Sequence, residues 1–185
     1  MQFCSEIMKK VLIICGSPRV NGNSDLLAAQ FAKGAQEAGH QVRTVYVRQL
    51  KMNYCHGCMA CLPDAMSCIQ HDDLNALLPW MMDADVVCFA TPVYYYSITA
   101  QMKTFIDRMN PLYGHWRDKE VYYMVTAAEE DHAQLDRAMD ALQGFVDCFE
   151  GMVVKGRIYG GGATDKGDIV RLPAYNKAYE MGRTI

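Results

Sequence analysis

Four cysteines lie close together in the sequence, and their spacing is suited to binding a metal cluster. Cys55, Cys58, Cys61 and Cys68 follow the pattern C-x2-C-x2-C-x6-C. Four thiolates gathered in one loop could hold a [4Fe-4S] cluster. Zinc is less natural, because structural zinc usually takes two pairs of ligands from separated turns. Free thiols and a regulatory disulfide are the other interpretations of the same pattern.

A second polar segment, residues 16–24, has the composition of a phosphate-binding loop. It joins an apolar run to a predicted helix, and free N–H groups at a helix start attract phosphate. Ser17, Asn23 and Ser24 add hydrogen-bond donors, and Arg19 adds positive charge. The glycine pattern of a dinucleotide site and the Gly-Lys-Ser/Thr ending of a P-loop are both missing from this segment. The alternative is that Asn23 or Ser24 only caps the helix.

A third segment, residues 91–108, opens with an aromatic stretch. Pro92 and Val93 precede three consecutive tyrosines, residues 94–96. A planar, redox-active ring needs apolar and aromatic walls together with backbone N–H groups, and an extended loop that opens with proline can present both. The alternative is that the tyrosines pack in the core or on a dimer surface.

The order of elements along the chain indicates where these segments lie. Apolar runs alternate with segments of helical period, which is typical of βαβ units around a buried parallel sheet. The predicted strands are residues 11–15, 42–47, 86–90, 121–126 and 152–159. The predicted helices are residues 24–38, one that begins at Asp72 or Asp73, 98–109, one from Asp131 to about Phe149, and 173–182. We predict an α/β fold with a doubly wound, five-stranded parallel sheet of order 2-1-3-4-5, in which ligands bind beyond the carboxyl ends of strands 1 and 3.

Composition restricts the class of protein. The chain has 185 residues, 51% of them hydrophobic, and a formal net charge of -3 with no run of like charges. We therefore expect a single domain over residues 1–185, with residues 1–7 as an N-terminal extension, and no nucleic-acid or membrane partner. The apolar runs are far shorter than a membrane helix, and the start has no secretory pattern. A cytoplasmic location follows as an expectation.

Segments 16–24 and 91–108 together resemble the NAD(P)H-dependent FMN reductase family of flavodoxin-like proteins. The resemblance implies an FMN phosphate on Ser17, Arg19, Asn23 and Ser24. It implies an isoalloxazine ring against Pro92, Val93, Tyr94 and Tyr95. By the same resemblance the loop after the fourth strand contributes Ala127 and Ala128, although the glycines often found there are missing. Many relatives are dimers or tetramers, so a homodimer or homotetramer is expected.

The cysteine pattern resembles the compact motif of iron-sulfur flavoproteins, a branch of the same superfamily. The resemblance to the FMN reductase family implies an FMN-dependent oxidoreductase that takes electrons from NAD(P)H and passes them to a flavin, a quinone or another small acceptor. The alternative is an electron-transfer module with FMN and a [4Fe-4S] cluster, whose partner is a small redox protein. No catalytic side chain is predicted, because the flavin itself performs the chemistry.

Overall fold

The computed structural model describes residues 7–62 and 66–185. It contains one five-stranded parallel sheet in the order β2-β1-β3-β4-β5, which confirms the predicted topology. The strands are β1 (Lys10–Cys15), β2 (Gln41–Tyr46), β3 (Val86–Pro92), β4 (Glu120–Thr126) and β5 (Val153–Gly160). Of the predicted N-terminal extension, residues 1–6 lie outside the described residues.

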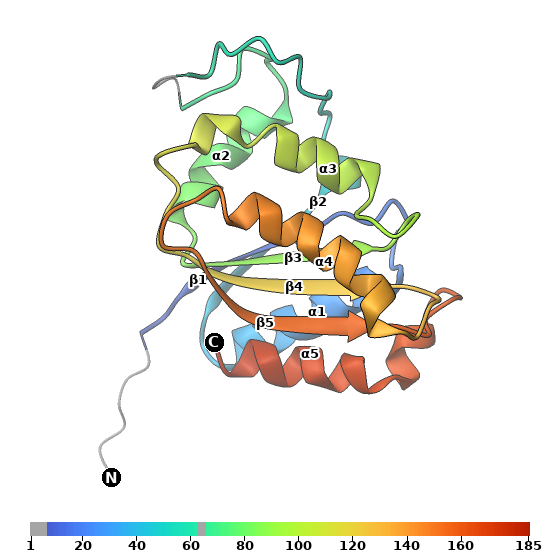
Figure 1. Ribbon diagram of the computed structural model, residues 1–185. Helices are drawn as coiled ribbons and strands as arrows, with labels where there is room; N and C mark the ends of the chain where they lie inside the picture. Colours follow the sequence, from blue (N-terminus) through green and yellow to red (C-terminus); the bar gives the residue numbers. More distant parts are fainter. Residues whose placement is uncertain (1–6, 63–65) are drawn as a thin grey trace.

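Helices cover both faces of the sheet (Figure 1). They are α1 (Asn23–Glu37), α2 (Asp73–Asp83), α3 (Ala100–Asp107), α4 (His132–Val146) and α5 (Pro173–Arg183). Helices α1 and α5 pack on one face and enclose an apolar core around Phe31 and Ile13. Helices α2, α3 and α4 pack on the other face, around Phe89 and Phe105. The sheet is therefore buried on both sides, as its apolar strands require.

Two glycines allow α1 and α5 to approach closely. A Cβ atom on Gly34 would lie 2.1 Å from the carbonyl oxygen of Tyr179, and one on Gly182 would lie 2.1 Å from that of Phe31. No side chain larger than hydrogen fits at either position without moving a helix.

Side-chain caps explain where three of the helices begin. Asp72 accepts a hydrogen bond from the Leu74 amide at 3.2 Å, so it caps α2. Thr99 caps α3 in the same way through the Met102 amide, and Asp131 caps α4 through Ala133. Each cap satisfies an amide that has no partner inside its helix.

Two helices are shorter than the sequence predicts. Helix α3 was expected over residues 98–109, but it begins after its Thr99 cap and ends at Asp107, ahead of a 3₁₀ turn that contains Pro111. Helix α4 was expected to reach Phe149, but it ends at Val146. There the chain tightens, and the Cys148 and Phe149 amides bond to carbonyls three residues earlier.

All five strands point the same way, so the loops that follow them meet at one edge of the sheet (Figure 1). The loops after β1, β3 and β4 and the loop before the 3₁₀ turn η3 (Asp168–Arg171) lie there. No helix in the described part of the chain is long and apolar enough to cross a membrane.

Candidate functional site: a phosphate and ring pocket beside a cysteine loop

A pocket of about 270 Å³ opens at the carboxyl edge of the sheet. It is lined by residues from four separate loops: Ser17, Arg19, Gly22, Asn23, Ser24, Pro92, Val93, Tyr94, Thr126, Ala127, Ala128, Ala163, Thr164 and Lys166. Every residue predicted to bind the cofactor is in this set except Tyr95, whose side chain is 100% exposed. Thr126, the last residue of β4, and three residues of the loop after β5, Ala163, Thr164 and Lys166, were not predicted to line the site.

The loop after β1 keeps hydrogen-bonding capacity for a ligand. The Ser17 hydroxyl accepts from the Arg19 amide at 3.1 Å and orders the turn. No side chain caps the start of α1, so its first amides remain available. The Ser24 side chain is buried at 1% exposure, and its Oγ has no hydrogen-bond partner in the described structure. Since buried hydroxyls are normally bonded, an unpartnered one in a pocket is available to hydrogen-bond a ligand.

The Asn23 side chain, unlike that of Ser24, already has hydrogen-bond partners within the protein. Its amide nitrogen donates to the carbonyls of Ala163 and Asp165, at 3.2 and 2.9 Å. Its amide oxygen accepts from the backbone amides of Gly167 and Ile169, at 2.9 and 3.4 Å. Both ends of the side chain are therefore engaged with the loop after β5.

A buried ion pair supports the loop from below. Arg48 contacts Asp25 through both terminal nitrogens, at 3.2 and 2.9 Å, and also donates to the Ser17 carbonyl at 3.1 Å. Asp25 accepts from the Asn21 amide at 3.0 Å. Burial raises the pKa of Asp25, although Arg48 and the Asn21 amide oppose the shift. The sequence carries no signal for this pair, because its members are 23 residues apart on different elements.

A second link joins the loop after β1 to α3. The Thr99 hydroxyl donates to the Gly16 carbonyl at 2.7 Å, inside the protein. The Gly16 amide in turn donates to the Ala90 carbonyl at 2.8 Å. The two loops that sequence analysis singled out are therefore bonded directly to each other at their bases.

Gly16 leaves no room for a side chain. A Cβ atom there would lie 2.8 Å from the Cβ of Met102. We expect Gly16→Ala to lower the free energy of unfolding by about 1–3 kcal/mol, measured by urea denaturation, because the loop or α3 must shift. Gly144→Ala is the control, since nothing lies within 4 Å of its Cβ position. A Gly16→Ala protein as stable as the unmodified chain would contradict the tight fit.

The loop after β3 forms the other wall of the pocket. The Val93 amide donates to the Thr126 carbonyl at 2.8 Å and continues the sheet into the loop. Tyr94 and Ser97 then close a tight turn, in which Tyr95 and Tyr96 have φ of 49° and 60°. Two tyrosines in this region are strained, since it favours glycine and asparagine. The turn points Tyr95 into solvent, and Arg137 lies over the Tyr96 ring at 5.0 Å.

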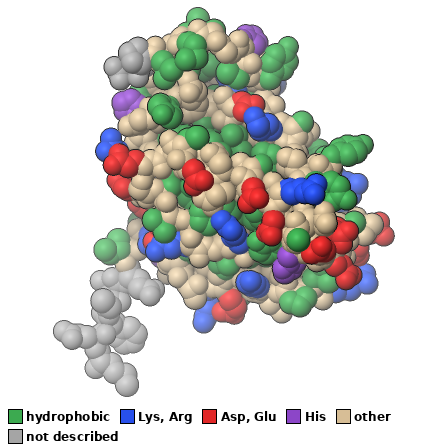
Figure 2. All heavy atoms as spheres, in the orientation of Figure 1, with side chains coloured by type: hydrophobic (Ala, Val, Ile, Leu, Met, Phe, Trp, Pro, Cys, Tyr) green, Lys and Arg blue, Asp and Glu red, His purple; other side chains and the backbone are tan. Residues whose placement is uncertain are grey.

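The four predicted metal ligands line a second pocket of about 220 Å³, in the loop before α2. In residues 7–62 and 66–185, no three His, Cys, Asp or Glu side chains are grouped closely enough to hold a single metal ion. A four-iron cluster differs from a single ion, because its thiolates surround a larger body. The loop also exposes four apolar side chains, those of Tyr54, Met59, Met66 and Ile69. Figure 2 shows hydrophobic side chains at the surface of the end of the molecule where this loop lies.

Residues at both ends of the cysteine loop are held by one buried arginine. The Arg108 side chain is 1% exposed and binds both Asp72 oxygens, at 2.8 and 3.0 Å. It also donates to the Asn53 carbonyl at 2.6 Å. Asn110 donates to the Cys61 sulfur at 3.1 Å, an N–H···S bond of the kind that tunes iron-sulfur clusters. These contacts of Arg108 and Asn110 were not predicted, although a helix was expected to begin at Asp72 or Asp73.

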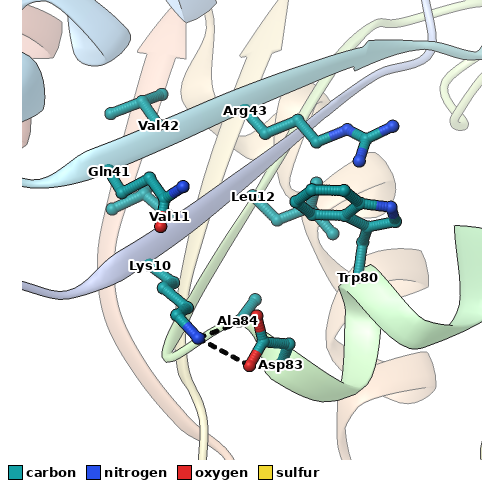
Figure 3. Close-up of a pocket in the computed structure, with 9 residues that line it drawn as sticks. All are labelled: Lys10, Val11, Leu12, Gln41, Val42, Arg43, Trp80, Asp83 and Ala84. Atoms are coloured by element: carbon teal, nitrogen blue, oxygen red, sulfur yellow. Dashed lines mark hydrogen bonds and ion pairs between the residues drawn. The ribbon is translucent and has the colours of Figure 1, made fainter.

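A larger hollow, about 510 Å³, lies at the other edge of the sheet (Figure 3). It is bounded by the amino ends of β1 and β2 and by the end of α2, where Arg43 stacks on Trp80 at 3.6 Å. Lys10 and Asp83 form an ion pair at its rim. It contains none of the predicted site residues, and ligands of this sheet topology bind at the opposite edge.

Comparison with known proteins agrees with this geometry. Residues 9–164 match the family of NADPH-dependent FMN reductases. The chain belongs to this family. The match spans the pocket loops after β1, β3 and β4 and the cysteine loop.

Individual members and neighbours extend the comparison. The chain is 44% identical over 106 residues to an iron-sulfur flavoprotein of Archaeoglobus fulgidus, covering 57% of this chain and 47% of that protein. It is 27% identical over 173 residues to YwqN of Bacillus subtilis, named as an NAD(P)H-dependent FMN-containing oxidoreductase, covering 88% and 90%. An NAD(P)H:quinone oxidoreductase structure from Methanothermobacter marburgensis has a TM-score of 0.75 at 16% identity, covering 95% and 96%, which confirms the flavodoxin-like fold of the family. The chain spans about half the length of the iron-sulfur flavoprotein that it matches.

Proposed function

We propose that this protein is an FMN-dependent oxidoreductase that takes electrons from NAD(P)H and passes them to a flavin, a quinone or another small acceptor. The buried, unpartnered Ser24 hydroxyl is the observation that carries the proposal. It lies in a pocket beside Arg19 and the uncapped start of α1, which together suit a terminal phosphate. Bound FMN would supply the transfer of hydride and of single electrons.

The residues of the pocket would bind and orient the cofactor. Ser17 shapes the phosphate turn, while Ser24 and the α1 amides offer hydrogen bonds to the phosphate oxygens. Pro92, Val93 and Tyr94 would form one wall for the ring, and Ala127 and Ala128 the other. We name no side chain as a proton donor or acceptor.

Flavin titration tests this assignment. Purified protein, stripped of any bound cofactor, is titrated with FMN while flavin fluorescence is followed, and NADPH oxidation is then measured with a quinone acceptor. Saturable quenching followed by turnover is expected. A protein that neither binds FMN nor oxidises NADPH in its presence would contradict the proposal.

A second candidate function is an electron-transfer module with FMN and a [4Fe-4S] cluster. It is favoured by the four cysteines around one pocket and by the Asn110 bond to Cys61. The name of the Archaeoglobus fulgidus relative supports the same assignment. Cys55, Cys58, Cys61 and Cys68 would hold the cluster, and a small redox protein would be the partner.

We expect Cys58→Ser to abolish iron binding and to leave FMN binding unchanged. The measurement is iron content and the visible spectrum after anaerobic reconstitution with iron and sulfide. Cys148→Ser is the control, because Cys148 is also exposed but lies outside the cysteine pocket. Full iron content in the Cys58→Ser protein would exclude the four-thiolate cluster.

The proposal also covers the domain extent, the oligomeric state and the location of the protein. We propose a single domain over residues 1–185 that assembles as a homodimer or homotetramer and acts in the cytoplasm. The fully exposed Tyr95 next to the pocket supports assembly, since a partner chain could cover it. Light scattering on the FMN-loaded protein tests the oligomeric state.

A further inference from the structure

The loop after β5 contributes residues to the same phosphate pocket that Arg19 lines. Residues 161–168 connect β5 to the 3₁₀ turn before α5 and lie at the ligand edge of the sheet (Figure 1). Ala163, Thr164 and Lys166 from this loop line the same pocket as Arg19 and Ser24. The sequence pattern of segment 16–24 gives no indication of this contribution, because the two loops are more than 130 residues apart.

The pocket carries two positively charged side chains, Arg19 and Lys166, and Lys166 also interacts electrostatically with the buried carboxylate of Asp25. Within the described residues, neither Arg19 nor Lys166 takes part in an ion pair. Asp25, the buried carboxylate nearby, is already paired with Arg48. In the loop itself, Asp168 accepts a hydrogen bond from the Asp165 amide, and neither of these residues lines the pocket.

This charge matches a phosphate monoester. At pH 7 a monoester carries about 1.5 to 2 negative charges, with its second pKa near 6. Riboflavin has no phosphate, and each phosphate in the diphosphate bridge of FAD carries one charge. Two cations and an unpartnered buried hydroxyl that line one pocket suit the dianion best.

The position of Lys166 is set by a residue at the start of α1. The four hydrogen bonds of Asn23 reach Ala163, Asp165, Gly167 and Ile169, which lie on both sides of Lys166 in the chain. An amide side chain that bonds a loop at four points fixes its backbone relative to α1. Lys166 therefore starts from an ordered backbone, which lowers the entropic cost of placing its ammonium group.

We infer that Lys166 is a second cationic ligand of the FMN phosphate, held in place by Asn23, and that it makes the site select flavin monophosphate over riboflavin and FAD. The inference rests on the proposed function and deepens it. It gives Asn23 a positioning role in place of the direct phosphate contact that the family resemblance implies. It also makes the C-terminal part of the chain part of the cofactor site.

Paired titrations test the inference. FMN and riboflavin are each titrated against the unmodified protein, Lys166→Met, Lys166→Arg and Lys155→Met, the last being an exposed lysine of β5 outside the pocket. Loss of one charge-assisted hydrogen bond should weaken FMN binding by about tenfold or more in Lys166→Met. Riboflavin affinity should not change, Lys166→Arg should retain most of the FMN affinity, and Lys155→Met should behave as the unmodified protein.

A double-mutant cycle tests the role of Asn23. Asn23→Ala should weaken FMN binding, and adding Lys166→Met to it should cost less than the Lys166→Met substitution alone, because the lysine is already misplaced. Fully additive losses would overturn the positioning role.

The outcomes separate the inference from the proposed function. If the unmodified protein binds FMN but Lys166→Met binds it equally well, or loses FMN and riboflavin affinity to the same extent, the inference is wrong and the proposed function stands. If the unmodified protein binds no FMN, both are wrong.

Discussion

Replacing Arg108 by methionine is expected to lower the free energy of unfolding by about 3–5 kcal/mol. The guanidinium is buried and binds both Asp72 oxygens and the Asn53 carbonyl. Methionine fills a similar volume but leaves the carboxylate and the carbonyl without their donor, and an uncompensated buried charge is costly. Urea denaturation followed by circular dichroism measures the difference.

Two variants make the result specific. Arg117→Met removes an exposed arginine whose nearest carboxylate oxygen, on Glu150, is 3.8 Å away, so its cost should stay below about 1 kcal/mol. Arg108→Lys keeps the charge but cannot bind both oxygens in the same plane, so it should fall between the two. Equal stability of Arg108→Met and Arg117→Met would mean that the buried pair contributes nothing.

The stabilisation by Arg108 and Asp72 should depend on pH. Partial burial pushes the pKa of Asp72 upward, but hydrogen bonds from Arg108 and from the Asn53 and Leu74 amides outweigh it, and the pKa lies below its usual value of 3.8. A lowered pKa means that the folded state favours the charged carboxylate, so the stabilisation is complete above about pH 4 and is lost as the pH falls further. The stability difference between the unmodified protein and Arg108→Met should therefore shrink in acid.

The second large effect is expected at Asp25. Asp25→Ala leaves the Arg48 guanidinium largely buried without its partner and removes the acceptor of the Asn21 amide. Because burial raises the pKa of Asp25 despite Arg48, the charged carboxylate is not ideally solvated in the folded state. Removing one partner of a buried ion pair usually costs about 3–5 kcal/mol, and we expect Asp25→Ala to lower the free energy of unfolding by about 3 kcal/mol, at the lower end of that range. FMN affinity should fall as well, because Arg48 also holds the Ser17 carbonyl.

A double-mutant cycle of Asp25→Ala and Arg48→Met measures the interaction between the two side chains separately from what each contributes alone. Asp25→Ala with Arg48→Met removes both charges, so it should be less destabilised than the sum of the single variants. Asp140→Ala, at an exposed position of α4, should change stability by less than about 0.5 kcal/mol. A double variant whose losses simply add would show that the two side chains act independently.

Elements with strong local signals could be predicted from the sequence. Apolar runs such as residues 11–15 and 86–90 are buried strands, and the right-handed crossover rule leads from five such units to a doubly wound sheet. The order chosen for that sheet, 2-1-3-4-5, is confirmed. The helix caps at Asp72 and Asp131 follow from the same local chemistry. Helix ends were less predictable, because the last turn before Gly151 tightens under the packing of Phe149.

Local sequence patterns predicted only some of the residues that line the site. Segment 16–24 and Pro92 to Tyr94 are recognisable because a strand end followed by a helix start dictates what the loop must offer. The family resemblance placed Tyr95 against the flavin ring, but a turn with positive φ angles at Tyr95 and Tyr96 directs its side chain into solvent. The conformation of this turn decides where the side chain points, and no composition pattern predicts it.

The sequence by itself determined which segments form strands and helices and which polar residue types follow the strands, because each of these depends on neighbours within a few positions. Only the tertiary structure decided which of these residues are free for a ligand and which are occupied. Asn23 is bonded to residues about 140 positions away, Arg48 reaches back to Asp25, and Arg108 joins Asn53 to Asp72. Such pairings depend on how separate loops meet in space, and burial strengthens the two ion pairs of Arg48 and Arg108 among them.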